Sequence, residues 1–171
     1  MSIGRSTCSG ARARSSRIGI ALQAYLYRTR EDVESLAPLG SAIRLVKGAY
    51  LEPPSIAYPT KAAVDENFYA LSCRLMEEDA RKVGGLLHMA THDPVLVERL
   101  IAFIDQRGIP KPAYEFAMLY GIQRALQQRL VQSGRPLRVL VAYGEYWFAW
   151  YMRRLAERPA NVWFVARNLF R

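Results

Sequence analysis

From residue 18 onward, short apolar runs alternate with longer amphipathic stretches, and this alternation restricts the possible folds more than any other feature of the sequence. The apolar runs are rich in β-branched and aromatic residues, as expected for strands that are buried on both faces. Strands that alternate with helices indicate a parallel sheet in an α/β protein. We predict strands over residues 18–27, 42–47, 86–91, 113–119 and 137–142.

The amphipathic stretches between these runs predict helices. The clearest helix covers residues 63–82, where Val64, Phe68 and Leu71 recur at helical spacing and form one apolar face. Other helices are predicted over residues 29–38, from Pro94 through Ile104, over residues 122–132 and over residues 146–157.

Residues at the ends of these segments carry familiar helix and loop signals. Thr29 is predicted to cap the first helix, with Asp32 as the acid of a capping box. Asp93 followed by Pro94 is the expected start of another helix. Three prolines within residues 51–61 predict a loop.

Two architectures fit this order of elements, a doubly wound sheet and a part of a (β/α)₈ barrel. The chain contains neither the glycine-rich dinucleotide-binding turn nor the P-loop motif after any predicted strand. The pattern alone does not choose between the two architectures.

The chain is basic, with 24 Lys and Arg residues against 15 Asp and Glu residues in 171, for a formal charge of +9. Residues 1–17 hold four arginines and no acid, and we predict a disordered basic leader there. An organelle transit sequence or a basic arm for nucleic acid is the alternative for this segment. The charge also keeps open a second class of function, a module that binds nucleic acid or an anionic surface.

Few residues are available for metal or nucleophilic chemistry. Cys8 and Cys73 are the only cysteines, and His88 and His92 are the only histidines. Two distant cysteines form neither a disulfide framework nor a zinc site, which favours a reducing compartment. We therefore predict no metal site and no histidine-cluster chemistry.

Polar residues follow the predicted strands at their carboxyl ends, for example Gln23, Lys47 and His92. Ligands bind at this edge of the sheet both in barrels and in doubly wound proteins. Arg44 lies inside a predicted strand and needs an anionic partner, because a buried guanidinium without one is costly. That partner is either a ligand or a core carboxylate such as Glu115.

Arg153 and Arg154 stand side by side on the last predicted helix. Two guanidinium groups can grip one carboxylate from two directions. The alternative is a solvated basic face in which Arg153 pairs with Glu157 one turn later.

Several runs of sequence, in one consistent order across residues 18–168, resemble the FAD-dependent proline dehydrogenases. The runs are LQAYLYRT (22–29), IRLVKGAY (43–50), ATHD (90–93), YEFAMLYGI (114–122) and WYMRRLAERPAN (150–161). The resemblance implies an α/β fold, a partial (β/α)₈ TIM-like barrel in which residues 18–171 supply about the last five strands with their helices. Because a complete barrel takes about 200–250 residues or more, we expect this chain to be an incomplete or inactive fragment of the catalytic domain.

The resemblance also implies a reaction, the oxidation of L-proline to 1-pyrroline-5-carboxylate with hydride transfer to FAD. A quinone would then accept the electrons. The implied location is cytoplasmic, with peripheral contact with the inner membrane as an option, and no nucleic acid is expected as a partner.

Site residues follow from the resemblance position by position. Arg153 and Arg154 would clamp the proline carboxylate, and Leu119 would pack against the proline ring. Arg44 would lie near the flavin ring and stabilise negative charge on it, which makes it the implied catalytic residue. The other implied cofactor-binding residues are Gln23, Val46, Gly48, Ala49, Lys61, Thr91, His92 and Glu157.

Four positions depart from the family pattern, namely Ala117, Leu140, Ala142 and Trp150. Leu140 and Trp150 replace tyrosines that shape the proline pocket, so two hydroxyl groups are lost there.

Overall fold

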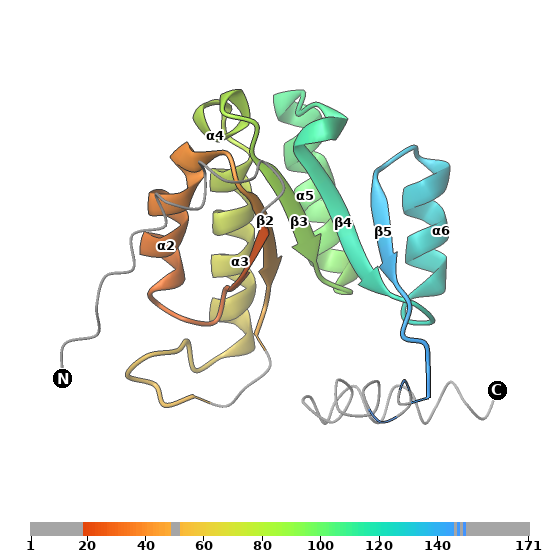
Figure 1. The fold of residues 1–171 in the computed structure, drawn as a ribbon, viewed down its shortest axis with the longest axis horizontal. Coiled ribbons are helices and arrows are strands. Elements are labelled where there is room, and N and C mark those ends of the chain that lie inside the picture. Colours follow the sequence, from red (N-terminus) through yellow and green to blue (C-terminus); the bar gives the residue numbers. More distant parts are fainter. Residues whose placement is uncertain (1–18, 49–51, 146, 148, 150–171) are drawn as a thin grey trace.

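The computed structural model describes residues 19–48, 52–145, 147 and 149. Within them, one parallel sheet has its strands in chain order (Figure 1). A doubly wound sheet reverses its strand order at a switch point, whereas a barrel does not. The order therefore agrees with the predicted piece of a barrel. The strands are β1 (Gly19–Gln23), β2 (Ala42–Val46), β3 (Leu86–Ala90), β4 (Tyr114–Leu119) and β5 (Leu137–Leu140).

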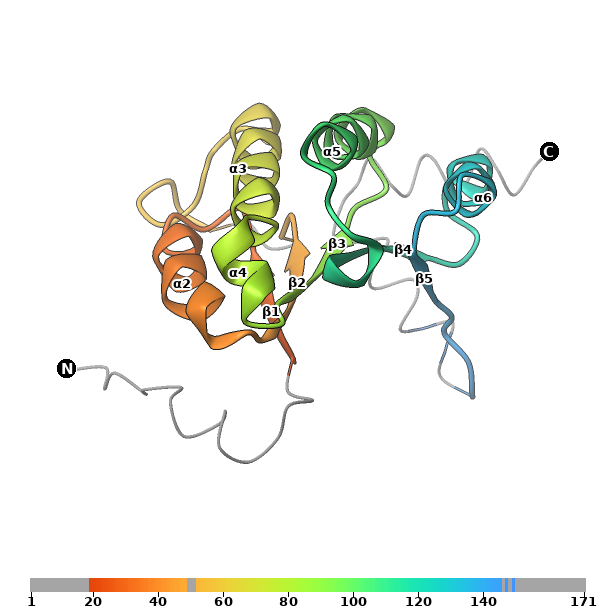
Figure 2. The ribbon, with the colours of Figure 1, turned by 90° about the horizontal axis from the view of Figure 1, so that it is seen from above.

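Helices lie between the strands and cover one side of the sheet (Figure 2). None of the described helices is long and apolar enough to cross a membrane. The α-helices are α2 (Thr29–Leu36), α3 (Lys61–Leu75), α4 (Glu78–Lys82), α5 (Pro94–Arg107) and α6 (Arg124–Gln132). Two short 3₁₀ helices, η1 (Ala37–Leu39) and η2 (Lys111–Ala113), precede β2 and β4.

The hydrophobic core lies between the sheet and these helices. Alternate residues of each strand point to the same face, and on the helix side they are almost entirely apolar. Ile43 and Leu45 of β2, for example, are at most 2% exposed and pack with Phe68 of α3 and Leu100 of α5. The same cluster includes Leu22, Leu87, Met89, Tyr114, Phe116 and Met118 from the other strands.

The opposite face of the sheet carries the intervening residues, and no described helix covers it (Figure 2). Arg44 is the neighbour of His88 across β2 and β3, and His88 is the neighbour of Glu115 across β3 and β4. In a closed barrel this face lines the interior. The polar side chains predicted to bind ligands from within the strands therefore share one face.

The long helix predicted over residues 63–82 is two helices. Glu77 has an extended backbone, with φ −68° and ψ 162°, which ends the first helix and starts α4. Leu75, Met76 and Ala80 are all buried in the same core cluster. The apolar spacing thus continues across the break, and this is why the pattern did not reveal it.

The predicted cap of α2 is wrong, whereas the predicted cap of α5 is confirmed. Arg28 occupies the cap position of α2, and buried Thr29 instead donates its hydroxyl to the Gln23 carbonyl at 2.5 Å. Asp93 caps α5 by accepting a hydrogen bond from the Val95 amide at 3.1 Å. The leader at residues 1–17 and almost all of the helix predicted over 146–157 lie outside the described residues.

Candidate active site

The carboxyl ends of the strands meet at one edge of the sheet, at the lower end in Figure 1. Gln23, Val46, Ala90 and Ala117 form one row across β1 to β4, close to this edge, on the face that the helices leave open. Arg44 lies one row further in. Gln23, Arg44 and Val46 therefore lie on the same open face of the sheet.

A cluster of four charged residues joins the ends of β2 and β3 to two helices. Lys47, directly after β2, has only 8% of its side chain exposed. Its Nζ lies 2.6 Å from Asp65 Oδ1 of α3 and 2.9 Å from Oδ2 of Asp93, the cap of α5. Lys61 Nζ reaches the same two carboxylates, 3.0 Å from Asp93 Oδ2 and in contact with Asp65 Oδ2. We call these four residues the charged cluster.

The charged cluster shifts the pKa of Asp93. Burial alone raises that pKa, but hydrogen bonds from Lys47 and Lys61 lower it by more, and the result is a pKa well below the ordinary value. The pKa of Lys61 is raised, mainly by its hydrogen bond to Asp65 and next by its hydrogen bond to Asp93. Both shifts favour the charged forms of Asp93 and Lys61.

A second polar network lies on the open face of the sheet. Glu115 Oε1 lies 2.5 Å from His88 Nδ1, and the same carboxylate accepts hydrogen bonds from Arg138 of β5. Burial raises the pKa of Glu115, but the bonds from Arg138 and His88 lower it by more. Glu115 is thus paired with His88 and Arg138. It is not the partner of Arg44 in this structure.

Acid should weaken the folded state through these two carboxylates. A carboxylate whose folded pKa is lowered adds stability that is complete above its unfolded pKa and is lost as the pH falls through the folded pKa. The ordinary pKa values are 3.8 for Asp93 and 4.5 for Glu115. Through these two carboxylates, we expect the urea midpoint to decline as the pH falls below about pH 5.

Two variants test whether these carboxylates cause the decline. Asp93→Asn and Glu115→Gln cannot titrate, so each should show a shallower loss of urea midpoint between pH 5 and pH 3 than the unaltered chain. Identical slopes in all three proteins would contradict this assignment.

His92 lies at the end of β3 and contacts the end of β4. Its Nε2 accepts a hydrogen bond from the Leu119 amide at 2.9 Å. Accepting this bond requires an unprotonated Nε2, so the proton of the neutral ring is on Nδ1. Thr91 is buried and accepts a bond from the Asp93 amide through its hydroxyl. Thr91, His92 and Leu119 are therefore neighbours at the carboxyl edge.

Gly48 follows the charged cluster and lies against an aromatic ring. Its φ of +112° is unfavourable for residues with a side chain. A Cβ atom added there would lie 2.2 Å from Cδ1 of the buried Tyr25. The Tyr25 amide in turn donates to the Lys47 carbonyl at 2.9 Å. The glycine is thus required by local packing, whatever ligand it meets.

Some predicted site residues cannot be placed. Ala49, Arg153, Arg154 and Glu157 lie outside the described residues. Sequence reasoning also missed the roles of Lys47, as the buried base of the charged cluster, and of Asp65. The signal for Lys47 was a lysine at the end of an apolar strand, directly before a glycine.

The comparisons with known proteins agree on one family. A family model described as "Proline dehydrogenase" matches residues 3–167. The chain is 44% identical over 154 residues to "Proline dehydrogenase" of Deinococcus radiodurans, in a match that covers 90% of this chain and 48% of that protein. It is 38% identical over 158 residues to "Proline dehydrogenase 2" of Bacillus subtilis (strain 168), covering 92% of this chain and 50% of that protein.

A solved structure supports the same family. Proline utilization A (PutA) from Bdellovibrio bacteriovorus, inactivated by N-propargylglycine, matches with a TM-score of 0.71 and 28% identity. That match covers 82% of this chain and 16% of the PutA chain. The chain spans about half the length of the curated relatives it matches. With a family model over nearly all its residues, the chain belongs to the proline dehydrogenase family.

Proposed function

We propose that this chain supplies part of an active site that oxidises L-proline to 1-pyrroline-5-carboxylate with FAD as cofactor. Its share of the site lies at the carboxyl edge of the sheet. Family membership supports the reaction. The observation that carries the proposal within the structure is Arg44. Its guanidinium stands on the open face, and no ion pair joins it to a carboxylate in the part of the chain that the structure describes.

The residues around Arg44 fit a flat cofactor. Ala90 and Ala117 add only methyl groups to this face, so their own side chains take up little of the space that a flat ring would need. When bound, FAD accepts the hydride from the substrate. Arg44 would stabilise the negative charge that the ring gains, and Gln23 would donate a hydrogen bond to the same ring system.

Residues at the strand ends would hold the rest of the cofactor. Backbone groups of Val46 and Gly48 would approach the flavin closely, because Gly48 adds no side chain. Lys61 has 70% of its side chain exposed, so its positive charge is available to a phosphate in spite of its contacts with Asp65 and Asp93. Ala49, Thr91, His92 and Glu157 complete the proposed cofactor set.

The substrate would lie beside β4 and β5. Leu119 and Leu140 are neighbours across these strands and offer an apolar wall to the proline ring. Arg153 and Arg154 are the proposed clamp for the carboxylate. Because Leu140 has no hydroxyl at a position where the resemblance implies a tyrosine, we expect weaker selection among cyclic amino acids.

We also propose that the chain alone does not turn over. The described sheet has two edge strands, β1 and β5, and helices on one side only, whereas parallel sheets are normally covered on both faces. The remaining half of the relatives' length would complete the barrel. Electrons would pass to a quinone, at a site in the cytoplasm that is open to the membrane surface.

The experiment that tests this function is a chimera. Residues 18–171 replace the matching half of the Deinococcus radiodurans relative, and proline-dependent reduction of a dye acceptor is measured. We expect the chimera to retain FAD and reduce the dye, and the chain alone to show less than about 1% of that rate, because most of the binding and orientation is absent.

Two results would contradict the proposal in different ways. A folded chimera that retains FAD but does not respond to proline would refute the proposed substrate. Turnover by the chain alone at a rate near that of the chimera would refute the proposed need for a second half.

A further inference from the structure

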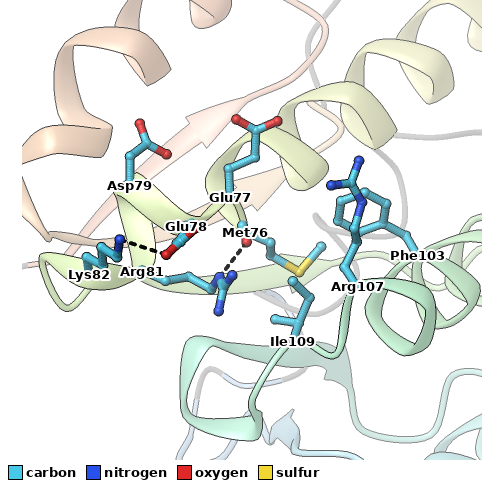
Figure 3. A pocket seen from close by; sticks show the side chains of 9 residues that line it. All are labelled: Met76, Glu77, Glu78, Asp79, Arg81, Lys82, Phe103, Arg107 and Ile109. Carbon is cyan, nitrogen blue, oxygen red and sulfur yellow. Dashed lines mark hydrogen bonds and ion pairs between the residues drawn. The ribbon is translucent and has the colours of Figure 1, made fainter.

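A hollow lies at the end of the sheet opposite the carboxyl edge, between α4 and the C-terminal half of α5 (Figure 3). Its volume is about 770 Å³, which is within the range of small-molecule sites. The apolar lining consists of Met76, which is fully buried, Ile109, which is 7% exposed, and Phe103. The charged lining residues are Glu77, Glu78, Asp79, Arg81, Lys82 and Arg107.

The acidic residues of this hollow already have basic partners. Glu78 Oε1 lies 2.6 Å from Lys82 Nζ. Asp79 accepts two hydrogen bonds of 3.0 Å from Arg74, which stands outside the hollow. Glu77 lies 3.8 Å from the same guanidinium. Arg74 also binds Glu34, so it offsets Glu77 and Asp79 only in part. Arg81, Lys82 and Arg107 line the same hollow and balance the three acidic residues in number.

Two arginines of the hollow have no such partner. Among the ion pairs of the described residues, none joins Arg81 or Arg107 to a carboxylate. The Nε of the half-buried Arg81 donates to the Met76 carbonyl at 2.8 Å, which holds the guanidinium beside the apolar lining (Figure 3). The guanidinium carbon of Arg107 lies 5.7 Å from the ring centre of Phe103.

We propose that this hollow binds a small organic anion, a carboxylate with a short apolar body. The carboxylate pairs with the terminal nitrogens of Arg81, because a guanidinium fork matches a carboxylate in shape and charge. The apolar body packs against the half-buried ring of Phe103 and removes part of its remaining surface from water. The hollow lies before the start of β3 and β4, so this site is separate from the proposed flavin site and does not depend on it.

The test uses the full chain without cofactor and hexanoate as the probe, with binding followed by saturation-transfer NMR. We expect saturable binding with a dissociation constant on the order of 1 mM, which is normal for a ligand this small. Arg81→Gln should weaken binding about tenfold, the usual effect of losing one hydrogen bond to a charged group. Lys82→Gln is the matched control, since Lys82 lines the same hollow but is paired with Glu78, and it should change binding less than about twofold.

Three outcomes would overturn the proposal. Equal hexanoate affinity in Arg81→Gln and the unaltered chain would remove Arg81 as the anchor. Hexanol or hexylamine binding as tightly as hexanoate would show that the negative charge is not recognised. This comparison uses the unaltered chain, so it does not depend on how a variant folds. Inorganic phosphate competing more strongly than hexanoate would show that the apolar body contributes nothing.

Discussion

Gly48→Ala will destabilise the folded chain by about 3–5 kcal/mol, since a side chain at positive φ adds strain and overpacking of a buried ring adds more. The φ of +112° and the 2.2 Å separation from Tyr25 Cδ1 both oppose a Cβ atom. Tyr25 has little space in which to move, because it is buried against Ala57 and Val64. Urea unfolding of the two proteins measures the difference in the free energy of unfolding.

A second glycine separates the two causes. Gly84 has a φ of +86° but nothing within 4 Å of an added Cβ. Gly84→Ala should therefore show only the backbone strain, about 1–2 kcal/mol. Combining Gly48→Ala with Tyr25→Ala should show less than the sum of the two single effects, because the clash is removed. Equal losses in Gly48→Ala and Gly84→Ala would contradict the packing explanation.

Lys47→Met will also have a large effect, a loss of about 3 kcal/mol, because removing one partner of a buried ion pair leaves uncompensated charge. Methionine keeps most of the length of the side chain, so the lost quantity is the charge rather than the packing. Asp65 and Asp93 would then have Lys61 as their one remaining cationic partner in the charged cluster, and most of the Lys61 side chain is in solvent. The urea midpoint again measures the loss.

Lys82→Met is the matched control for this variant. Lys82 pairs with Glu78 one turn away on α4, and both side chains are at least 70% exposed. Exposed pairs of this kind contribute little to stability, because solvent screens them, so we expect a much smaller loss than in Lys47→Met. Similar losses in Lys47→Met and Lys82→Met would mean that the charged cluster stabilises the fold no more than an exposed ion pair does.

Local signals in the sequence predicted most of the elements. The apolar runs predicted the strands, because the length and composition of a run reflect burial on both faces of a parallel sheet. The dipeptide Asp93–Pro94 predicted the start of α5, because a cap depends only on neighbouring residues. The order of the motifs predicted the family, which the comparisons confirm.

The sequence pattern did not show which of several groups would form a given hydrogen bond. Thr29 was expected to cap its own helix, but the carbonyl of Gln23 takes its hydroxyl. Glu115 was considered as a partner for Arg44, but His88 and Arg138 bind it instead. Side chains that meet only through the fold leave no spacing that a sequence can reveal.

We expect the carboxyl edge of this sheet to hold the flavin, and FAD retention by the chimera measures this binding. Arg44→Gln removes a charge from the open face of the sheet, and Arg81→Gln removes the same charge from the hollow near the amino ends of β3 and β4. After dialysis, we expect Arg44→Gln to bind FAD about tenfold more weakly, the effect of one hydrogen bond to a charged group, and Arg81→Gln to bind it as the parent does. Equal FAD affinity in all three proteins, or a loss confined to Arg81→Gln, would contradict the claim.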